Sequence, residues 1–136
     1  MIVFLVTAIA LVSALASVTE TVATPALIVT AYEQQLADAT NAARVANGAK
    51  PLVIDPTMQA YARRHTIAQE RYGMHHGRAP GAENVAAGQR SIPEVIRAWL
   101  NSKGHRANML NRRHTRMAVC GYTINGHTYW TQVFGN

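Results

Sequence analysis

The chain has 136 residues, of which 49% are hydrophobic and 15% are charged. This composition excludes an intrinsically disordered chain, and the length fits one domain that can bury its own core. The formal net charge of +6 is unevenly distributed, because residues 1–55 carry two basic and four acidic side chains whereas residues 56–136 carry eleven basic and three acidic ones.

The first segment has the features of an export signal. Residues 2–16 are apolar and uncharged, and Ala14-Leu15-Ala16 has the small-x-small pattern of a signal-peptidase site, with a second candidate site near Ala26. The uncharged run is marginal for a bilayer span of about 20 residues. We therefore expect a cleaved signal peptide over residues 1–16, or as far as residue 26, rather than an uncleaved anchor. A mobile lead-in over residues 17–30 and a folded domain over residues 31–136 would follow.

Two helices are expected next. Residues 27–47 contain no Gly or Pro, and Gly48 is a suitable stop because glycine accepts the left-handed conformation. The buried face predicted by three- and four-residue spacing contains Val29, Tyr32, Leu36, Ala39, Ala43 and Ala46. After a short apolar connector, Asp55-Pro56 reads as an N-cap followed by the first helical position, and this second helix should end near Gly73.

The middle of the chain is expected to contain a loop and a third helix. Residues 73–90 are rich in glycine and should be mostly loop. Ser91 and Glu94 have the spacing of a capping box at the start of the third helix, which Gly104 should interrupt.

The last part of the chain changes to a strand pattern. Residues 118–124 and 127–134 flank Asn125-Gly126, which is a preferred two-residue hairpin turn. Helices followed by a hairpin predict an α+β domain in which helices pack on an antiparallel sheet. Cys120, the only cysteine, lies in an apolar strand and cannot form an internal disulfide, so we expect a buried, inert thiol.

Four segments in a fixed order carry a family resemblance. They are residues 51–56 (PLVIDP), His76 followed by residues 81–88 (GAENVAAG), residues 98–110 (AWLNSKGHRANML), and residues 129–135 (YWTQVFG). Together they resemble the bacterial branch of the CAP superfamily, also called SCP-like, which includes cysteine-rich secretory, antigen 5 and plant pathogenesis-related proteins. The resemblance covers about residues 31–136 and implies an α-β-α sandwich with a central cleft.

The resemblance also implies a set of cleft residues. Eukaryotic members of the family carry a tetrad of two histidines and two acidic residues. The matching positions here are His76, with His75 as the alternative register, Glu83 and His105, while Ser102 stands where the second acidic residue would be. The two imidazoles could bind Zn²⁺ or another divalent metal, and Glu83 could complete the site, orient an imidazole or act as a base.

Two function classes follow. The leading expectation is a secreted protein, in the cell envelope or outside the cell, that acts as a binding module. Its cleft would accept a divalent metal and a lipid or peptidic ligand, and its basic half would favour an anionic envelope component. The alternative is a metal-assisted hydrolase with Glu83 as its base. Nucleic-acid binding ranks last because no nucleic-acid motif accompanies the arginines.

Several other polar and aromatic residues have simpler expected roles. Ser102 and His105 are three residues apart, but Gly104 breaks the helix between them, so a capping role for Ser102 is favoured over a nucleophile–base pair. His65 is expected to be a hydrogen-bonded core residue, whereas His114 and His127 are expected at the surface. Core packing is expected for Trp99 and Trp130, and a loop-buttressing role for Asn84 and Asn108.

Overall fold

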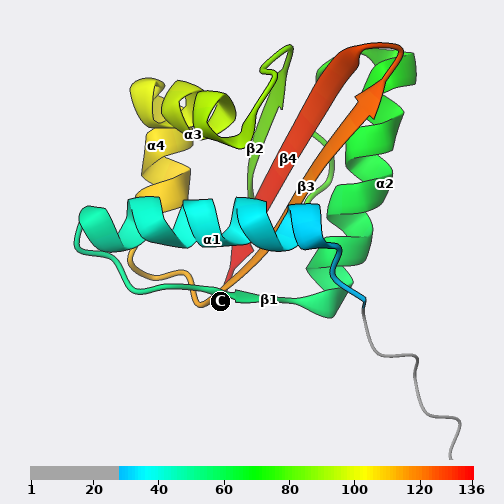
Figure 1. Cartoon of the computed structure of the whole chain (residues 1–136). Coiled ribbons are helices and arrows are strands. Elements are labelled where there is room, and N and C mark those ends of the chain that lie inside the picture. Colours follow the sequence, from blue (N-terminus) through cyan, green and yellow to red (C-terminus); the bar gives the residue numbers. More distant parts are fainter. Residues whose placement is uncertain (1–27) are drawn as a thin grey trace, which may run out of the picture.

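The computed structural model describes residues 28–136, so the expected signal peptide and most of the expected lead-in lie outside the described residues. The described elements are α1 (Ala31–Ala46), β1 (Val53–Ile54), α2 (Pro56–Tyr72), β2 (Ala82–Ala87), α3 (Ile92–Asn101), α4 (Lys103–Leu110), β3 (Arg116–Ile124) and β4 (His127–Gly135). Figure 1 shows these helices arranged around one sheet. Within residues 28–136, no helix is both long enough and apolar enough to cross a membrane.

The sheet is built on the expected C-terminal hairpin. Asn125 and Gly126 have φ angles of 51° and 77°, as a two-residue turn of this kind requires, so the predicted hairpin is confirmed. The strand order is β1-β3-β4-β2, which places β2 at one edge, antiparallel to β4. The prediction of a purely antiparallel sheet is wrong in one detail, because β1 pairs in parallel with the start of β3.

Strand β2 also corrects the expectation of a long loop. Residues 82–87 pair with residues 129–134 of β4 along their whole length. The glycines that suggested a loop lie on either side of this strand. Because the partner strand is more than 40 residues further along the chain, local sequence could not reveal the pairing.

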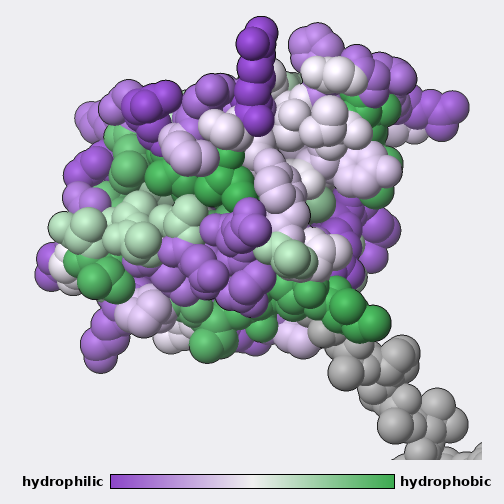
Figure 2. Space-filling view, in the orientation of Figure 1, coloured by the Kyte–Doolittle hydropathy of each residue, from purple (hydrophilic) through white to green (hydrophobic). Residues whose placement is uncertain are grey.

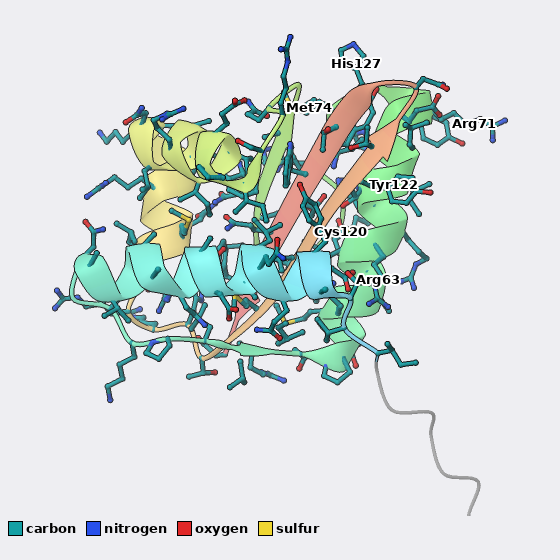
Figure 3. The ribbon with its side chains drawn as sticks, in the orientation of Figure 1. Arg63, Arg71, Met74, Cys120, Tyr122 and His127 are labelled. Atoms are coloured by element: carbon teal, nitrogen blue, oxygen red, sulfur yellow. The ribbon has the colours of Figure 1, made fainter. Side chains whose placement is uncertain are left out.

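The sheet separates two hydrophobic cores, which confirms the expected three-layer arrangement. Trp99, Trp130 and Phe134 belong to the larger core, where α1, α3 and α4 pack on one face. Cys120 and Val133 belong to the smaller core under α2 on the other face. Figure 3 labels Cys120 within the fold, and its burial raises the pKa of the thiol to about 11, so the expectation of a buried cysteine is confirmed.

The helix ends largely follow the predicted signals. Asp55 is the N-cap of α2 and accepts a hydrogen bond from the Met58 amide at 2.9 Å. Gly48 follows α1 with a φ angle of 73°. The break between α3 and α4 falls at Ser102, two residues before the predicted Gly104, and Ser102 serves as both the C-cap of α3 and the N-cap of α4.

The buried face of α1 differs from the predicted one. Its buried residues are Glu33, Leu36, Ala37, Thr40 and Arg44. Tyr32 and Ala46, which the apolar spacing placed inside, are exposed. The face was predicted wrongly because polar side chains with tertiary partners are buried here. Glu33, for example, forms an ion pair with Arg63 of α2 at 2.6 Å.

Candidate functional site

The candidate site forms around Glu83, at the open edge of the sheet. Glu83 lies in the edge strand β2, and its side chain is buried. Its Oε1 accepts hydrogen bonds from the Gly77 amide at 2.8 Å and from His76 Nδ1 at 3.1 Å. Its Oε2 accepts one from the Tyr61 hydroxyl at 2.7 Å. The carboxylate is therefore held by donors from α2 and from the loop before β2.

Side chains of α2 enclose the rest of this carboxylate. His65 Nε2 lies 3.7 Å from Glu83 Oε2 and contacts the His75 carbonyl oxygen at 2.9 Å. The rings of Tyr61 and His65 are stacked with centroids 5.5 Å apart. Burial raises the pKa of Tyr61, and the hydrogen bond to Glu83 adds to this shift, so the phenol remains a donor.

Gly77 allows the loop to pass this close to α2. A methyl group added at Gly77 would overlap the Tyr61 hydroxyl and approach the His65 ring within 2.9 Å. Any larger residue would therefore displace the amide that donates to Glu83. The loop conformation and the position of the carboxylate depend on each other.

His76 is oriented by Glu83 but open to solvent. Its side chain is 62% exposed, and its Nδ1 is engaged by the carboxylate. The other ring nitrogen, Nε2, then carries the lone pair of the neutral imidazole and is available to a ligand. A carboxylate behind a histidine is the usual arrangement for orienting a metal ligand.

His105 lies in the first turn of α4 and is partly buried. Burial lowers the pKa of His105, and a positive charge on His76 would lower it further. His105 is therefore neutral at pH 7. The carboxylate of Glu83 and the side chain of Asn84 project from opposite faces of β2, because successive strand residues alternate.

Asn84 fixes α4 against the face of the sheet opposite to Glu83. Its Nδ2 donates to the His105 carbonyl at 3.0 Å and to Gln132 Oε1 at 3.1 Å. Asn108 Nδ2 donates to Asn84 Oδ1 at 3.0 Å. Asn84 and Asn108 were expected to buttress loops, but these bonds instead connect β2 to α4 and hold the backbone of His105.

A small cavity adjoins His105. It has a volume of about 250 Å³, and its lining includes Met74, Val85, Ala98, Trp99, Ser102 and His105. Figure 3 labels Met74 near the top of β2, at one side of this region. The lining is mostly apolar, and its polar side chains are those of Ser102, His105 and Gln89, so a ligand here would bind through an apolar surface with few polar contacts.

The structure brings most of the predicted site residues into one region. Glu83 contacts His76, a charge on His76 would lower the pKa of His105, and Ser102 lines the cavity beside His105. His75, the alternative to His76, instead directs its Nδ1 to the Gly73 carbonyl at 2.7 Å. Within residues 28–136, no group of three or more His, Cys, Asp or Glu side chains is arranged to hold a metal ion.

Three residues of this region were not predicted as site residues. They are Tyr61, His65, which was expected only as a hydrogen-bonded core residue, and Gly77, which falls in the expected loop. The sequence did contain an indication of this arrangement. Tyr61 and His65 are four positions apart on one helix face, and their polar groups require hydrogen-bond partners when buried. His114 was predicted at the surface, yet both of its ring nitrogens are buried without hydrogen-bond partners among the described residues.

Comparisons with known proteins agree with this architecture. The chain is 37% identical to the uncharacterized protein YkwD of Bacillus subtilis over 124 residues, which cover 78% of this chain and 48% of that protein. The chain thus spans about half the length of this relative. An outer surface protein from Borrelia burgdorferi has the same fold, with a TM-score of 0.70 and 22% identity over 80% of this chain and 96% of that one.

Other solved structures with this fold extend the comparison. An extracellular protein containing a SCP domain from Bacillus anthracis has a TM-score of 0.62 and 22% identity, over 75% of this chain and 40% of that one. NaASP2, solved with Zn²⁺, has a TM-score of 0.64 and 12% identity, over 76% of this chain and 78% of that one. The Cysteine-rich secretory protein family profile (CAP) matches residues 37–134, and the chain belongs to this family.

Proposed function

We propose that the protein is an extracellular binding module that holds a divalent metal between His76 and His105. The observation that carries this proposal is the bond between Glu83 Oε1 and His76 Nδ1. Because this bond occupies Nδ1, it directs the lone pair of Nε2 toward a ligand. His105 is neutral, as a metal ligand must be, because burial lowers its pKa.

A bound Zn²⁺ would supply a Lewis-acidic centre with open coordination positions, since the protein offers two nitrogen ligands. Glu83 positions His76, and Asn84 holds the backbone of His105. The cavity beside His105 would receive the apolar part of a lipid or peptidic ligand. NaASP2 with Zn²⁺ shares this fold, which supports metal binding as a property to test here.

Binding is favoured over hydrolysis by the surroundings of Glu83. Three hydrogen-bond donors already occupy its two oxygens, so Glu83 is better placed to orient His76 than to accept a proton from a substrate or water. Ser102 occupies the position expected for a second carboxylate. A metal-assisted hydrolase with Glu83 as base remains the second candidate function. The hydroxyl of Ser102 would not replace the missing carboxylate as a second base in such an enzyme.

The metal site is tested by calorimetric titration of Zn²⁺ into the folded protein. We expect His76→Ala and His105→Ala each to weaken binding by about tenfold or more, because each removes one of two protein ligands. His127→Ala is the matched control, since His127 is exposed at the hairpin turn and should leave affinity unchanged. Equal affinities in all four proteins would refute the proposed site.

An extracellular location is the second part of the proposal. The Borrelia burgdorferi relative is an outer surface protein, and the Bacillus anthracis relative is extracellular, which supports this location for the present chain. We expect expression of the full sequence in a bacterial host to give exported protein whose first residue is 17 or lies near 27. N-terminal sequencing of the exported protein measures this. Recovery of the intact N-terminus in a membrane fraction would instead favour an anchor.

A further inference from the structure

A second pocket lies at the opposite end of α4 from His105. It has a volume of about 450 Å³ and is formed by the loop after α1 and the loop before β3, which run close together below α1 in Figure 1. Its lining consists of Gly48, Lys50, Pro51, Arg112, His114 and Thr115. None of these residues is acidic, and none lines the cavity beside His105.

A buried arginine holds together the two loops that form this pocket. Arg44 is fully buried, and its Nε donates to the Lys50 carbonyl at 2.9 Å. Its Nη1 donates to the carbonyls of Met109 at 2.6 Å and Asn111 at 3.1 Å. The guanidinium thus bridges the two loops that form the pocket walls.

The charge of Arg44 has no carboxylate partner among the described residues. The negative ends of two helices compensate for it instead, because Arg44 lies in the last turn of α1 and binds carbonyls at the end of α4. Its Nη2, however, has no hydrogen-bond partner within residues 28–136. A buried donor of this kind is rarely left unsatisfied in a folded protein.

His114 adds a second unsatisfied group to the same pocket. Its ring is stacked on Phe134, and neither ring nitrogen has a hydrogen-bond partner of good geometry among the described residues. Burial lowers the pKa of His114; a side-chain interaction with Asn136 opposes this shift, and the charge of Arg44 reinforces it. The pocket therefore combines neutral His114 with the exposed cations Lys50 and Arg112.

We propose that this pocket binds a phosphate group. Lys50 and Arg112 supply charged donors from the two loops, and His114 lies beside them in the lining. A tetrahedral anion with several acceptor oxygens fits donors that converge from different directions. The phosphate belongs either to a soluble phosphorylated molecule or to a lipid headgroup, and both present the same chemistry to Lys50 and Arg112.

The direct test follows the histidine side chains by NMR in metal-free protein with a chelator present. Inorganic phosphate replaces chloride at constant ionic strength, so general screening does not change. We expect saturable shifts of the His114 resonances and a raised His114 pKa, because a bound anion favours the imidazolium. The resonances of exposed His127 should not follow the same curve.

Four variants locate the binding. Lys50→Ala and Arg112→Ala should each weaken phosphate binding by about tenfold or more, as expected for loss of a charge-assisted hydrogen bond. Lys103→Ala and Arg97→Ala remove exposed cations outside the pocket and should leave the affinity unchanged. Shifts that do not saturate, or equal weakening in all four variants, would overturn the proposal. Because metal is absent, this result is independent of the His76–His105 site.

Vesicles identify the source of the phosphate. Phosphatidic acid presents a phosphate monoester in a membrane, whereas phosphatidylcholine presents a headgroup with no net charge. Binding of inorganic phosphate together with Lys50- and Arg112-dependent binding to phosphatidic acid vesicles indicates a lipid headgroup. Binding of inorganic phosphate without vesicle binding indicates a soluble phosphorylated ligand.

Discussion

At the scale of single residues, Glu83 determines which nitrogen of His76 a ligand can reach. The carboxylate binds Nδ1 and itself rests on Tyr61 and the Gly77 amide. Each of these contacts is a hydrogen bond to a charged acceptor in a partly buried place, where such bonds are stronger than at the surface. Glu83 is therefore a positioning residue for the proposed metal site.

Replacement of this carboxylate should weaken metal binding without unfolding the domain. We expect Glu83→Gln to lower Zn²⁺ affinity by about 10- to 100-fold, the usual effect of losing a partner behind a histidine ligand. Calorimetric titration gives the affinity, and circular dichroism verifies the fold. Glu70→Gln, which changes an exposed carboxylate in α2, is the control. Unchanged affinity in Glu83→Gln would contradict the positioning role.

Glu33 shows a structural use of a buried carboxylate in the same fold. Burial by itself would raise the pKa of Glu33, but hydrogen bonds from Arg63, the Thr30 amide and Gln59 bring it below its usual value. Its carboxylate caps α1 and joins this helix to α2. The two carboxylates thus have different roles. The groups that donate to Glu33 join two helices, whereas one of the groups that donate to Glu83 is the exposed imidazole of His76.

At the scale of elements, close packing across the hairpin fixes how α1 lies on the sheet. Gly121 of β3 faces the indole of Trp130 in β4 and the ring of Tyr32 in α1. The rings of Tyr32 and Trp130 have centroids 6.0 Å apart. Figure 2 shows the face on which α1 lies, where hydrophobic residues gather between α1 and the α3–α4 pair. Ile96 and Leu100 are partly buried residues packed against this core.

Two glycine substitutions should therefore have opposite effects on stability. A methyl group at Gly121 would lie 2.6 Å from the Trp130 ring, so Gly121→Ala should destabilise the domain by about 1–3 kcal/mol. Gly104 lies in α4 with nothing within 4 Å of an added methyl group, so Gly104→Ala should stabilise it by about 0.5–1 kcal/mol. Urea unfolding monitored by tryptophan fluorescence measures both. A stabilising Gly121→Ala would show that this packing is wrong.

At the scale of the whole molecule, the folded state keeps two histidines less basic than they are in the unfolded chain. Burial lowers the pKa of both His105 and His114 below the ordinary value of 6.5. As pH falls below 6.5, the unfolded chain therefore binds protons at these positions before the folded protein does. Protonation thus favours the unfolded state, and stability is lost on the acid side of this value.

We expect the free energy of unfolding to be nearly constant from pH 8 to 7 and to decrease as pH falls from about 6.5 to 5. Urea titrations at each pH measure it in metal-free protein. His114→Asn should show a smaller decrease, because one of the two groups no longer titrates. The pKa values of Glu33 and Asp55 are lowered, so these two groups reduce stability only when pH falls below their ordinary values of 4.5 and 3.8. Stability that increased between pH 7 and 5 would be incompatible with this account.

The sequence by itself determined the elements with strong local signals. The Asp55 N-cap, the Gly48 stop and the Asn125-Gly126 turn are encoded within a few residues, and the hairpin follows from alternating side chains. The ordered motifs also identified the family, and they predicted His76, Glu83, Ser102 and His105 as cleft residues. These features could be predicted because each depends on short-range geometry or on a continuous motif.

Only the tertiary structure decided how distant polar groups satisfy one another. Pairing with β4 makes residues 82–87 a strand, and donors from α2 and a loop determine that Glu83 holds His76. Arg44 is buried because carbonyls from two other segments surround it. Residue spacing predicts which side chains share a face, but burial of a charge depends on partners that folding alone brings together.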